Sequence, residues 1–371
     1  MRRLLLVLAL FVFACGGQLP PDPSAPPTST PPVANPDQPN KPSGTGQDPD
    51  RPQTPGVIGG DPDDTPAAAG GNGNNGNGNP TQPTAGGAPY PIVFAHGLFG
   101  FDKIGPISYW WNVLPELEKD GNKVFAAKMD PANDSVVRGK QLLAFVKKVL
   151  QDTGAAKVNI IGHSQGGFEA RYVAAVEPNL VGAVVTVGTP HQGTKLADTI
   201  LSKVKPAQVE LLKAFFNLLG QAFFGEIAKH SDVEAAAKQL STAGARDFNA
   251  KYPDSAGVSY YSVGGWTGIL AQKPAAMCQS SIAPQFVMQF DKFKDTPDLN
   301  MLLTGLVIGQ QPHDGVVELS STKWGQWLGC VPADHMDQVG QMLGDQPGLG
   351  NGFNHIEFYR GMVKFLRSKG F

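Results

Sequence analysis

Short apolar runs alternate with amphipathic stretches between residue 90 and the end of the chain, which has 371 residues. Five runs rich in Val, Ile, Phe and Ala have the length of buried strands: 92–95, 124–127, 157–161, 183–187 and 258–263. Four other stretches predict helices: 109–119, 135–152, 168–176 and 357–367. Strands that alternate with helices predict an α/β fold with a mostly parallel central sheet flanked by helices.

The pattern changes between residues 196 and 252, which predict helices with few strand signals. Within 206–226, one face carries the apolar side chains Leu212, Phe215, Phe216, Leu219 and Phe223. This face is wider than a surface helix needs. We therefore expect a helical lid over an apolar cleft, with a cap packed permanently on the core as the alternative.

The N-terminus has the layout of a secretory signal peptide. Two arginines precede the apolar run 4–13, which is too short to span a bilayer as a helix. Residues 12–15 then resemble a bacterial lipobox that ends at Cys15. We predict a signal peptide over 1–15 and a lipid on Cys15, which would make the protein an extracytoplasmic lipoprotein of the outer membrane or cell surface. Simple secretion is the alternative.

Residues 16–88 are a predicted linker. They hold more than half of the 32 prolines of the chain and no aromatic residue, and 72–79 contain only Asn and Gly. Such a segment buries too little apolar surface to offset the entropy of ordering it, so we expect disorder. The globular domain is then 89–371, which is long enough for one large core. The net charge of −2 gives no reason to expect a nucleic-acid partner.

The chain has three cysteines, an odd number for a protein expected outside the cytoplasm. Lipidation would use Cys15 and leave Cys278 and Cys330. We predict a disulfide between these two, and two free buried thiols are the alternative.

The pentapeptide Gly162-His163-Ser164-Gln165-Gly166 reads G-x-S-x-G between a predicted strand and a predicted helix. In that setting it indicates a nucleophile elbow, a sharp turn that presents the serine at a helix N-terminus. At either glycine position, a residue with a Cβ would collide with the neighbouring strand or helix. We predict that Ser164 is a nucleophile, and a glycine-rich turn without chemistry is the alternative.

A serine nucleophile needs a base and an orienting carboxylate, which in α/β-hydrolases follow in the order Ser, Asp or Glu, His. Asp314 lies in a Gly-containing turn before an apolar pair, and His335 follows it. His355 competes as the base but lies beside the last predicted helix, and His191 precedes the acid. We predict Asp314 as the acid and His335 as the base. The alternative for Asp314 is a residue that only fixes its turn.

An oxyanion hole needs backbone N–H groups aimed at the tetrahedral oxygen. One should belong to Gln165, the residue after the nucleophile. The other should come from the loop after the first strand, 96–98, where we predict the N–H of Leu98.

Four segments together resemble the Pseudomonas–Burkholderia family of secreted triacylglycerol lipases: 90–98, 138–143, 157–176 and 188–191. The resemblance runs through most of 90–371. It implies an α/β-hydrolase fold with a mobile helical lid, hydrolysis of carboxylic esters with a preference for acyl lipids, and a structural calcium ion. The family's catalytic serine, aspartate and histidine fall on Ser164, Asp314 and His335.

The same resemblance implies the calcium ligands. Carboxylates of Asp295 and Asp337 and backbone carbonyls of Gln341 and Asp345 fall on the family's ligand positions, with Asp291 and Asp298 as alternative carboxylates. Such a set suits a hard cation. Asp337 would then hold the loop of His335 in place.

Three departures from the family affect what is expected. The family's cysteine after the catalytic aspartate is absent, with Ser320 near its place, so a disulfide must run differently. Phe99 replaces the usual small polar residue after His-Gly-Leu, which changes the expected shape of the acyl pocket. The lipobox and the linker are not typical of freely secreted members.

The sequence therefore predicts a serine hydrolase of carboxylic esters, first a triacylglycerol lipase, that acts at a lipid interface as a monomer through an acyl-enzyme. Alternatives are an esterase, a phospholipase or a polyester hydrolase with the same triad, and a non-catalytic surface lipoprotein that uses the fold for binding. A dedicated folding chaperone is an expected partner of many family members.

Overall fold

The computed structural model describes residues 90–104, 107–203, 232–268, 275–280, 287, 289–341 and 352–371. Several predictions lie outside these residues: the signal peptide, the lipid on Cys15, the linker, residues 204–231 of the lid and the ligand Asp345.

A six-stranded sheet forms the centre of the described domain, and every neighbouring pair of its strands is parallel. The strand order is β4-β1-β5-β6-β7-β8. The strands are β1 (Ile92–Ala95), β4 (Val124–Ala126), β5 (Val158–His163), β6 (Val181–Val187), β7 (Ser259–Trp266) and β8 (Gln326–Pro332). The sequence predicted all of them except β8, whose glycine and proline hide a strand signal and are tolerated at a sheet edge. A separate antiparallel pair consists of β2 (Lys103–Ile104) and β3 (Ile107–Ser108).

The helices cover both faces of the sheet. The described helices are α2 (Val113–Lys119), α3 (Ser135–Thr153), α4 (Gly166–Val176), α5 (Lys195–Lys203), α8 (Val233–Leu240), α9 (Thr242–Lys251), α10 (Ala275–Cys278), α12 (Leu299–Ile308) and α13 (His355–Ser368), with short 3-10 turns η1 (Pro178–Leu180) and η2 (Asp337–Val339). The Asp134 carboxylate caps α3 by accepting from two backbone N–H groups, and Gly154 ends α3 in the left-handed conformation. The sequence predicted no element at 299–308, where the structure has the helix α12.

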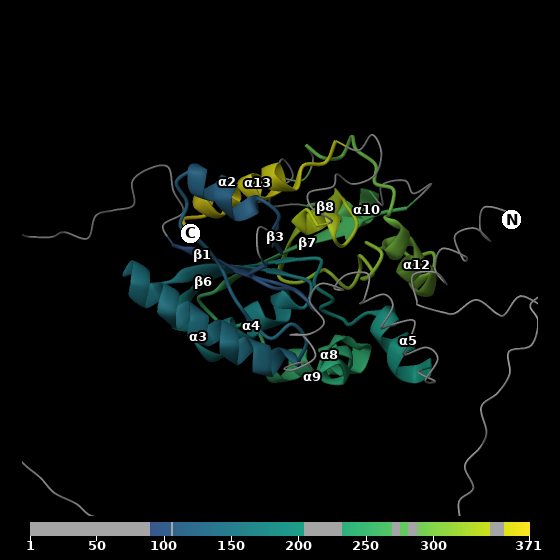
Figure 1. The fold of residues 1–371 in the computed structure, drawn as a ribbon, viewed down its shortest axis with the longest axis horizontal. Helices are drawn as coiled ribbons and strands as arrows, with labels where there is room; N and C mark the ends of the chain where they lie inside the picture. The colour runs from purple at the N-terminus through teal and green to yellow at the C-terminus, as the bar shows by residue number, and fades with distance from the viewer. Residues whose placement is uncertain are drawn as a thin grey trace, which may run out of the picture. The chain divides into compact units, whose positions relative to one another are not determined.

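Side-chain alternation along the strands builds a core on each face. On β1, Ile92 and Phe94 join the core that also contains residues of α2 and α13, whereas Val93 and Ala95 join the core with residues of α3 and α4. Figure 1 shows α2 and α13 on one side of the sheet and α3 and α4 on the other. The parallel sheet is thus buried on both faces, as its near-continuous apolar strands require.

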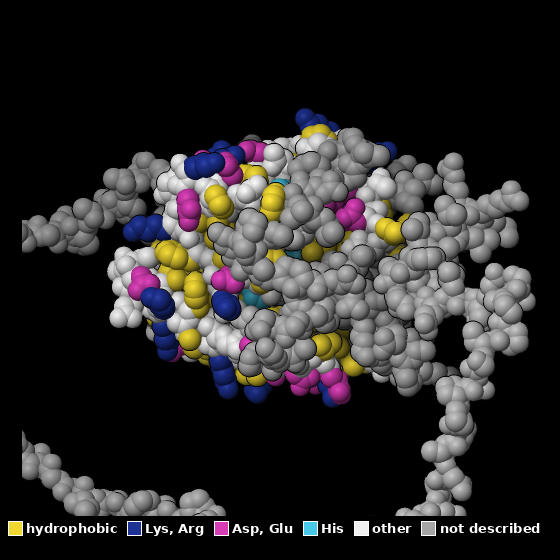
Figure 2. Space-filling view, in the orientation of Figure 1, with side chains coloured by type: hydrophobic (Ala, Val, Ile, Leu, Met, Phe, Trp, Pro, Cys, Tyr) yellow, Lys and Arg dark blue, Asp and Glu magenta, His cyan; other side chains and the backbone are white. Residues whose placement is uncertain are grey.

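The predicted disulfide between Cys278 and Cys330 is confirmed, and it ties α10 to the edge strand β8 with a Cα–Cα distance of 4.9 Å. None of the helices in the described ranges is long and apolar enough to cross a membrane. On the face drawn in Figure 2, acidic and basic side chains are interspersed, which agrees with the small net charge.

Candidate active site

Ser164 stands at the turn between β5 and α4, as the G-x-S-x-G pattern predicts. Its φ is 56°, a conformation that non-glycine residues rarely adopt. Its N–H donates to the carbonyl of Val187 over 2.9 Å, which pins the turn to the neighbouring strand. A Cβ on Gly166 would overlap the carbonyl oxygen of Ala95, and one on Gly162 would overlap the backbone of Gly166. The turn is therefore as tight as a nucleophile elbow requires.

Asp314 and His335 lie together, as the chain order predicts. The Nδ1 of His335 is 2.7 Å from the Oδ2 of Asp314, and both side chains are buried. The two loops are also joined through their backbones, since His335 N–H donates to the Asp314 carbonyl over 2.8 Å. The ring centroid of His335 lies 4.6 Å from that of His163, the residue directly before Ser164. The acid, the base and the elbow therefore meet at the carboxyl end of the sheet.

Three further hydrogen bonds keep the Asp314 carboxylate in place. Oδ1 accepts from Val316 N–H at 3.0 Å and Val317 N–H at 2.8 Å, and Oδ2 accepts from the amide of Gln338 at 2.9 Å. Burial alone would raise the pKa of Asp314, but His335 and these donors outweigh burial and hold the pKa below its usual value. Asp314 is thus fixed as an anion beside the His335 ring. Gln338 was not predicted as a site residue, and its place three residues after His335 is the only signal of its role in the sequence.

The loop after β1 presents the N–H of Leu98 in the way an oxyanion donor requires. Gly97 N–H donates to the Tyr109 hydroxyl over 3.1 Å, and Phe99 N–H donates to the Pro131 carbonyl over 2.6 Å. Among the described residues, no such acceptor engages Leu98 N–H. Phe99 has a φ of 56°, so the departure from the family falls on a turn residue in the left-handed region. A Cβ on Gly97 would lie 2.8 Å from the Cβ of Ser164, which places this loop directly against the elbow.

Arg138, which is fully buried on α3, holds the same loop from behind. Its guanidinium donates to the carbonyls of His96 at 2.6 Å and Gly97 at 3.2 Å, and to the side-chain oxygen of Gln165 at 3.3 Å. Its charge pairs with buried Glu169 at 3.4 Å. One planar cation thus connects the two segments that carry the predicted oxyanion donors. Arg138 begins one of the segments that resemble the lipase family, 138–143, but no role was predicted for it from the sequence.

A second connection runs through Tyr109 and His163. The Tyr109 hydroxyl accepts from Gly97 N–H and lies 2.6 Å from Nδ1 of His163, to which it donates. Burial, and then the charge of neighbouring His335, lower the pKa of His163 well below its usual value. A neutral His163 does not repel a proton that arrives on His335. His335 is therefore the ring of this pair that can take up a proton.

The competing histidines have structural partners. His355 begins α13, and its Nε2 lies 2.8 Å from the Trp111 carbonyl. His191 is buried between Thr186 and Arg171, at 2.9 and 3.2 Å from its two ring nitrogens. Neither histidine contacts Asp314 in the described residues, so the choice of His335 over both agrees with the geometry.

Three buried aspartates gather behind His335. Carboxylate oxygens of Asp295, Asp334 and Asp337 all lie within 4.8 Å of one another. Burial, and then the charge of Asp295, raise the pKa of Asp334 to about 7. Three buried carboxylates at this spacing fit a hard divalent cation. Asp295 and Asp337 are thus brought together as predicted, while Asp334 was missed.

The third predicted ligand in the described chain, Gln341, directs its side-chain amide to the carbonyls of Ser108 and Tyr109. The predicted role uses its backbone carbonyl, which these contacts leave unused. Asp334 itself accepts from the N–H groups of Met336 and Asp337 on one oxygen and from Asp298 N–H on the other. It therefore also ties the loop of His335 to the start of α12.

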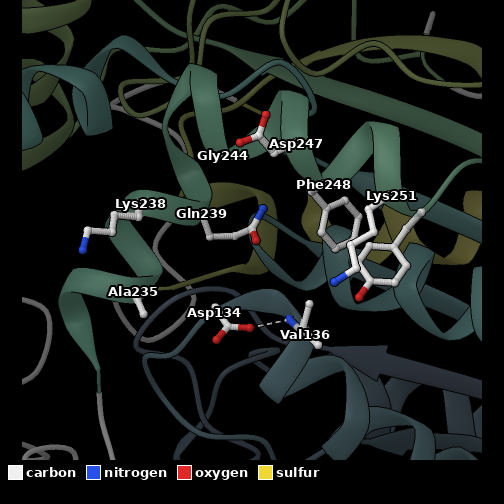
Figure 3. Close-up of a pocket in the computed structure, with 10 residues that line it drawn as sticks. Asp134, Val136, Ala235, Lys238, Gln239, Gly244, Asp247, Phe248 and Lys251 are labelled. Carbon is white, nitrogen blue, oxygen red and sulfur yellow. Dashed lines mark hydrogen bonds between the residues drawn. The ribbon is translucent and has the colours of Figure 1, made fainter.

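An open hollow of about 360 Å³ lies between the start of α3 and helices α8 and α9. Figure 3 shows the charged side chains of Asp134, Lys238, Asp247 and Lys251 around it, with Phe248 at its wall. It contains none of the triad residues and no base placed against a nucleophile. The hollow is therefore separate from the candidate active site.

Comparisons with known proteins agree with this geometry. The model of the alpha/beta hydrolase fold family matches residues 90–292. A triacylglycerol lipase of Pseudarthrobacter phenanthrenivorans is 34% identical over 289 residues, which cover 69% of this chain and 90% of that protein. A triacylglycerol lipase of Pseudomonas fragi is 31% identical, with 76% of this chain and 97% of that protein covered.

Among solved structures, the Staphylococcus hyicus lipase matches with a TM-score of 0.56 at 19% identity, over 78% of this chain and 98% of that one. This likeness supports the fold alone. The sequence relatives, the family model and the sheet together place the protein: the chain belongs to the α/β-hydrolase family, among the bacterial lipases of the Pseudomonas–Burkholderia type, and is a serine hydrolase of carboxylic esters.

Proposed function

We propose that the protein is a triacylglycerol lipase in which Ser164 is the nucleophile, His335 the general base and acid, and Asp314 the carboxylate that orients the base. The observation that carries this proposal is the buried 2.7 Å pair of His335 and Asp314 beside the elbow. The names of the relatives, triacylglycerol lipases of three bacterial genera, support the choice of substrate.

In the first half of the reaction, the hydroxyl oxygen of Ser164 attacks the ester carbonyl carbon, and its proton passes to Nε2 of His335. Nε2 is the nitrogen available because Nδ1 is engaged by Asp314. The imidazolium that forms is stabilised by the anionic Asp314. The carbonyl oxygen becomes an oxyanion, to which the N–H groups of Leu98 and Gln165 donate.

In the second half, the C–O bond to the alcohol breaks, and His335 returns its proton to the leaving oxygen. The acyl group stays on Ser164 as an ester. A water molecule then gives a proton to His335 and attacks the acyl carbon. The bond between the acyl carbon and the Ser164 oxygen then breaks, His335 returns its proton to that oxygen, and the carboxylic acid is released.

We also propose a structural calcium ion at the carboxylate cluster, held by Asp295 and Asp337 with the backbone carbonyl of Gln341. The ion would supply positive charge that keeps three buried carboxylates ionised side by side. The protein's own part is to connect the loop of His335, through Asp334 and Asp337, to the segment that contains Asp295. Asp345, the remaining predicted ligand, lies outside the described residues.

The place of action is a proposal from the sequence alone. The lipobox-like end of the leader supports a lipid on Cys15, and the proline-rich segment after it supports a tether outside the cytoplasm. A tethered lipase would meet esters near the cell surface. Esterase, phospholipase and polyester-hydrolase activities would use the same triad, and a profile over acyl length and head group distinguishes them.

The test is the Ser164→Ala variant, assayed on emulsified trioctanoin and on dissolved p-nitrophenyl butyrate. We expect activity on both substrates to fall by about 10⁴-fold or more, because the nucleophile is lost. A fluorophosphonate probe should label the wild type at Ser164 and leave the variant unlabelled. Full activity of the variant on both esters would rule out the proposal.

A further inference from the structure

The ring of His335, the proposed base, packs against a second histidine ring. The ring centroids of His335 and His163 lie 4.6 Å apart, with 43° between the ring planes. The indole of Trp110 also meets the His163 ring, at 6.2 Å between centroids and 79° between planes. His163 and Trp110 are completely buried. In a close-packed interior, a ring enclosed in this way cannot turn without displacing its neighbours. His163 therefore gives His335 a fixed surface to lie against.

The Tyr109 hydroxyl determines how the His163 ring is oriented. This hydroxyl accepts from Gly97 N–H over 3.1 Å, and a backbone N–H can only donate. The hydroxyl proton therefore goes to Nδ1 of His163, which lies 2.6 Å from the hydroxyl oxygen. The neutral ring of His163 then carries its own proton on Nε2. Turning the ring over would take Nδ1 away from the hydroxyl and leave buried polar groups without their partners, which is costly.

The segment that contains Tyr109 is itself attached to the loop of His335. The side-chain amide of Gln341 donates to the Tyr109 carbonyl. The N–H of Trp111 donates to the Val339 carbonyl over 3.1 Å. Val339 and Gln341 follow His335 in the same loop. The loop of His335 thus holds the backbone of Tyr109, and the Tyr109 hydroxyl holds the ring on which His335 packs.

His163 is suited to positioning and not to proton transfer. Its Nδ1 is occupied by the Tyr109 hydroxyl. Burial, and then the charge of His335, lower the pKa of His163 well below its usual value. Burial also raises the pKa of Tyr109, so both members of the pair stay neutral. A neutral ring can contact His335 equally well before and after the base takes up a proton.

We propose that Tyr109 and His163 are positioning residues for the general base. The Tyr109 hydroxyl holds the His163 ring, and the His163 ring holds His335 in the orientation in which Nδ1 meets Asp314 and Nε2 remains for Ser164. This inference rests on the proposed function, since it assigns the proton transfer to His335. The same hydroxyl accepts from Gly97 N–H, next to the predicted oxyanion donor Leu98. One oxygen atom therefore fixes the base and the oxyanion loop relative to each other.

Two substitutions separate the ring contact from the hydrogen bond. His163→Asn places a side-chain oxygen near the position of Nδ1, so it can still accept from Tyr109, but it removes the ring that contacts His335. Tyr109→Phe removes one oxygen atom and keeps the aromatic packing. We expect each variant to lower kcat on dissolved p-nitrophenyl butyrate at least about ten-fold with KM within about twofold, because a poorly held base loses part of its contribution of about 10²–10⁴-fold.

The low-field proton resonance of the His335–Asp314 hydrogen bond reports on the base itself. We expect both variants to shift or broaden this resonance, although Tyr109 reaches His335 only through His163. Tyr260→Phe is the matched control, because the Tyr260 hydroxyl accepts from the N–H of Ser255 over 3.0 Å outside the site. The control should lose a comparable free energy of unfolding in urea and keep the kcat and the resonance of the wild type.

The proposal would be overturned by a folded His163→Asn enzyme that keeps kcat within about threefold of the wild type. An unchanged His335 resonance in either folded variant would overturn it as well. If His163→Asn does not fold, Tyr109→Phe tests the same chain of contacts by the same two measurements. A wild type that hydrolyses no ester and is not labelled at Ser164 by a fluorophosphonate would instead refute the proposed function.

Discussion

The substitution Arg138→Lys tests whether the loop of Leu98 must be held by a planar cation. In the wild type, the Arg138 guanidinium donates to two carbonyls of the loop, to the Pro131 carbonyl and to Gln165. Lysine keeps the charge beside Glu169, but a single ammonium cannot reach all the acceptors that lie around the edge of the planar guanidinium group. The substitution therefore keeps the positive charge but removes the planar set of N–H donors.

The expected magnitude follows from those contacts. A hydrogen bond from a charged donor contributes about 1.5–3 kcal/mol, and lysine leaves at least one buried carbonyl of His96 or Gly97 without its donor. We expect the free energy of unfolding to fall by about 2–4 kcal/mol. Removing one oxyanion-hole donor costs about 10²–10³-fold in kcat. Because Leu98 N–H is displaced rather than deleted, we expect kcat on dissolved p-nitrophenyl butyrate to fall about 10²-fold with little change in KM.

The assay combines steady-state kinetics with urea unfolding, both at pH 7 and 25 °C. Lys140→Met is the matched control, since Lys140 lies on the same helix with an exposed side chain. A second variant, Arg138→Met with Glu169→Gln, removes the whole ion pair. We expect it to recover stability relative to Arg138→Met alone, because no unpaired buried charge remains, but not to recover kcat.

The reasoning would be refuted by an Arg138→Lys enzyme that is folded and keeps kcat within about threefold of the wild type. Such a result would mean that the loop of Leu98 is positioned by Tyr109 and Pro131 alone. Recovery of kcat in the variant without the ion pair would have the same meaning.

Three further predictions concern burial, the disulfide and the cation. Burial, only partly offset by Arg138, raises the pKa of Glu169 from its ordinary 4.5 to about 7, so the stability it contributes is complete below pH 4.5 and is lost as pH rises through 7. The loss is up to about 3 kcal/mol, and urea unfolding from pH 4.5 to 8 should show a flatter profile for Glu169→Gln; an unchanged profile would contradict the argument. Cys278→Ser combined with Cys330→Ser should lower the free energy of unfolding by up to about 4 kcal/mol for a sequence separation of 52, and reductant should then have no further effect on the melting temperature. A calcium chelator should lower the melting temperature of the wild type by several degrees, because three buried carboxylates lose their counter-ion, and Asp337→Asn should abolish that response; a wild type insensitive to chelator would argue against the site.

The elements with a regular pattern were predictable from the sequence. The strand before Ser164 and the helix after it follow from a β-branched run, a glycine-flanked turn and helical spacing. The chain order of serine, acid and base then selects Asp314 and His335 because each lies in a loop after the elbow. These inferences depend on local sequence and on one topological rule, and both are visible without a structure.

Other parts depend on contacts that no local pattern records. The edge strand β8 contains Gly329 and Pro332, so its pairing with β7 decides its conformation. Helix α12 was not predicted because its apolar residues have no polar face to mark a helical period. Asp334 and Gln338 acquire roles only because the His335 loop folds back against other segments. Arg138 is 26 residues before the elbow in the sequence, and only tertiary packing brings it under the oxyanion loop.

The order of the strands has a consequence for how the protein acquires activity. The strands β5, β6, β7 and β8 lie side by side in the sheet in the order of their synthesis. Ser164 follows β5, the first of these four, whereas Asp314 and His335 lie in the loops before and after β8, the last. The nucleophile's surroundings can thus assemble from the first half of the domain, whereas the general base arrives only when the final strand pairs. A chain that is truncated before β8 or still emerging from the ribosome therefore carries the serine without its base. Hydrolytic activity is therefore expected only after the last strand has paired and folding is complete.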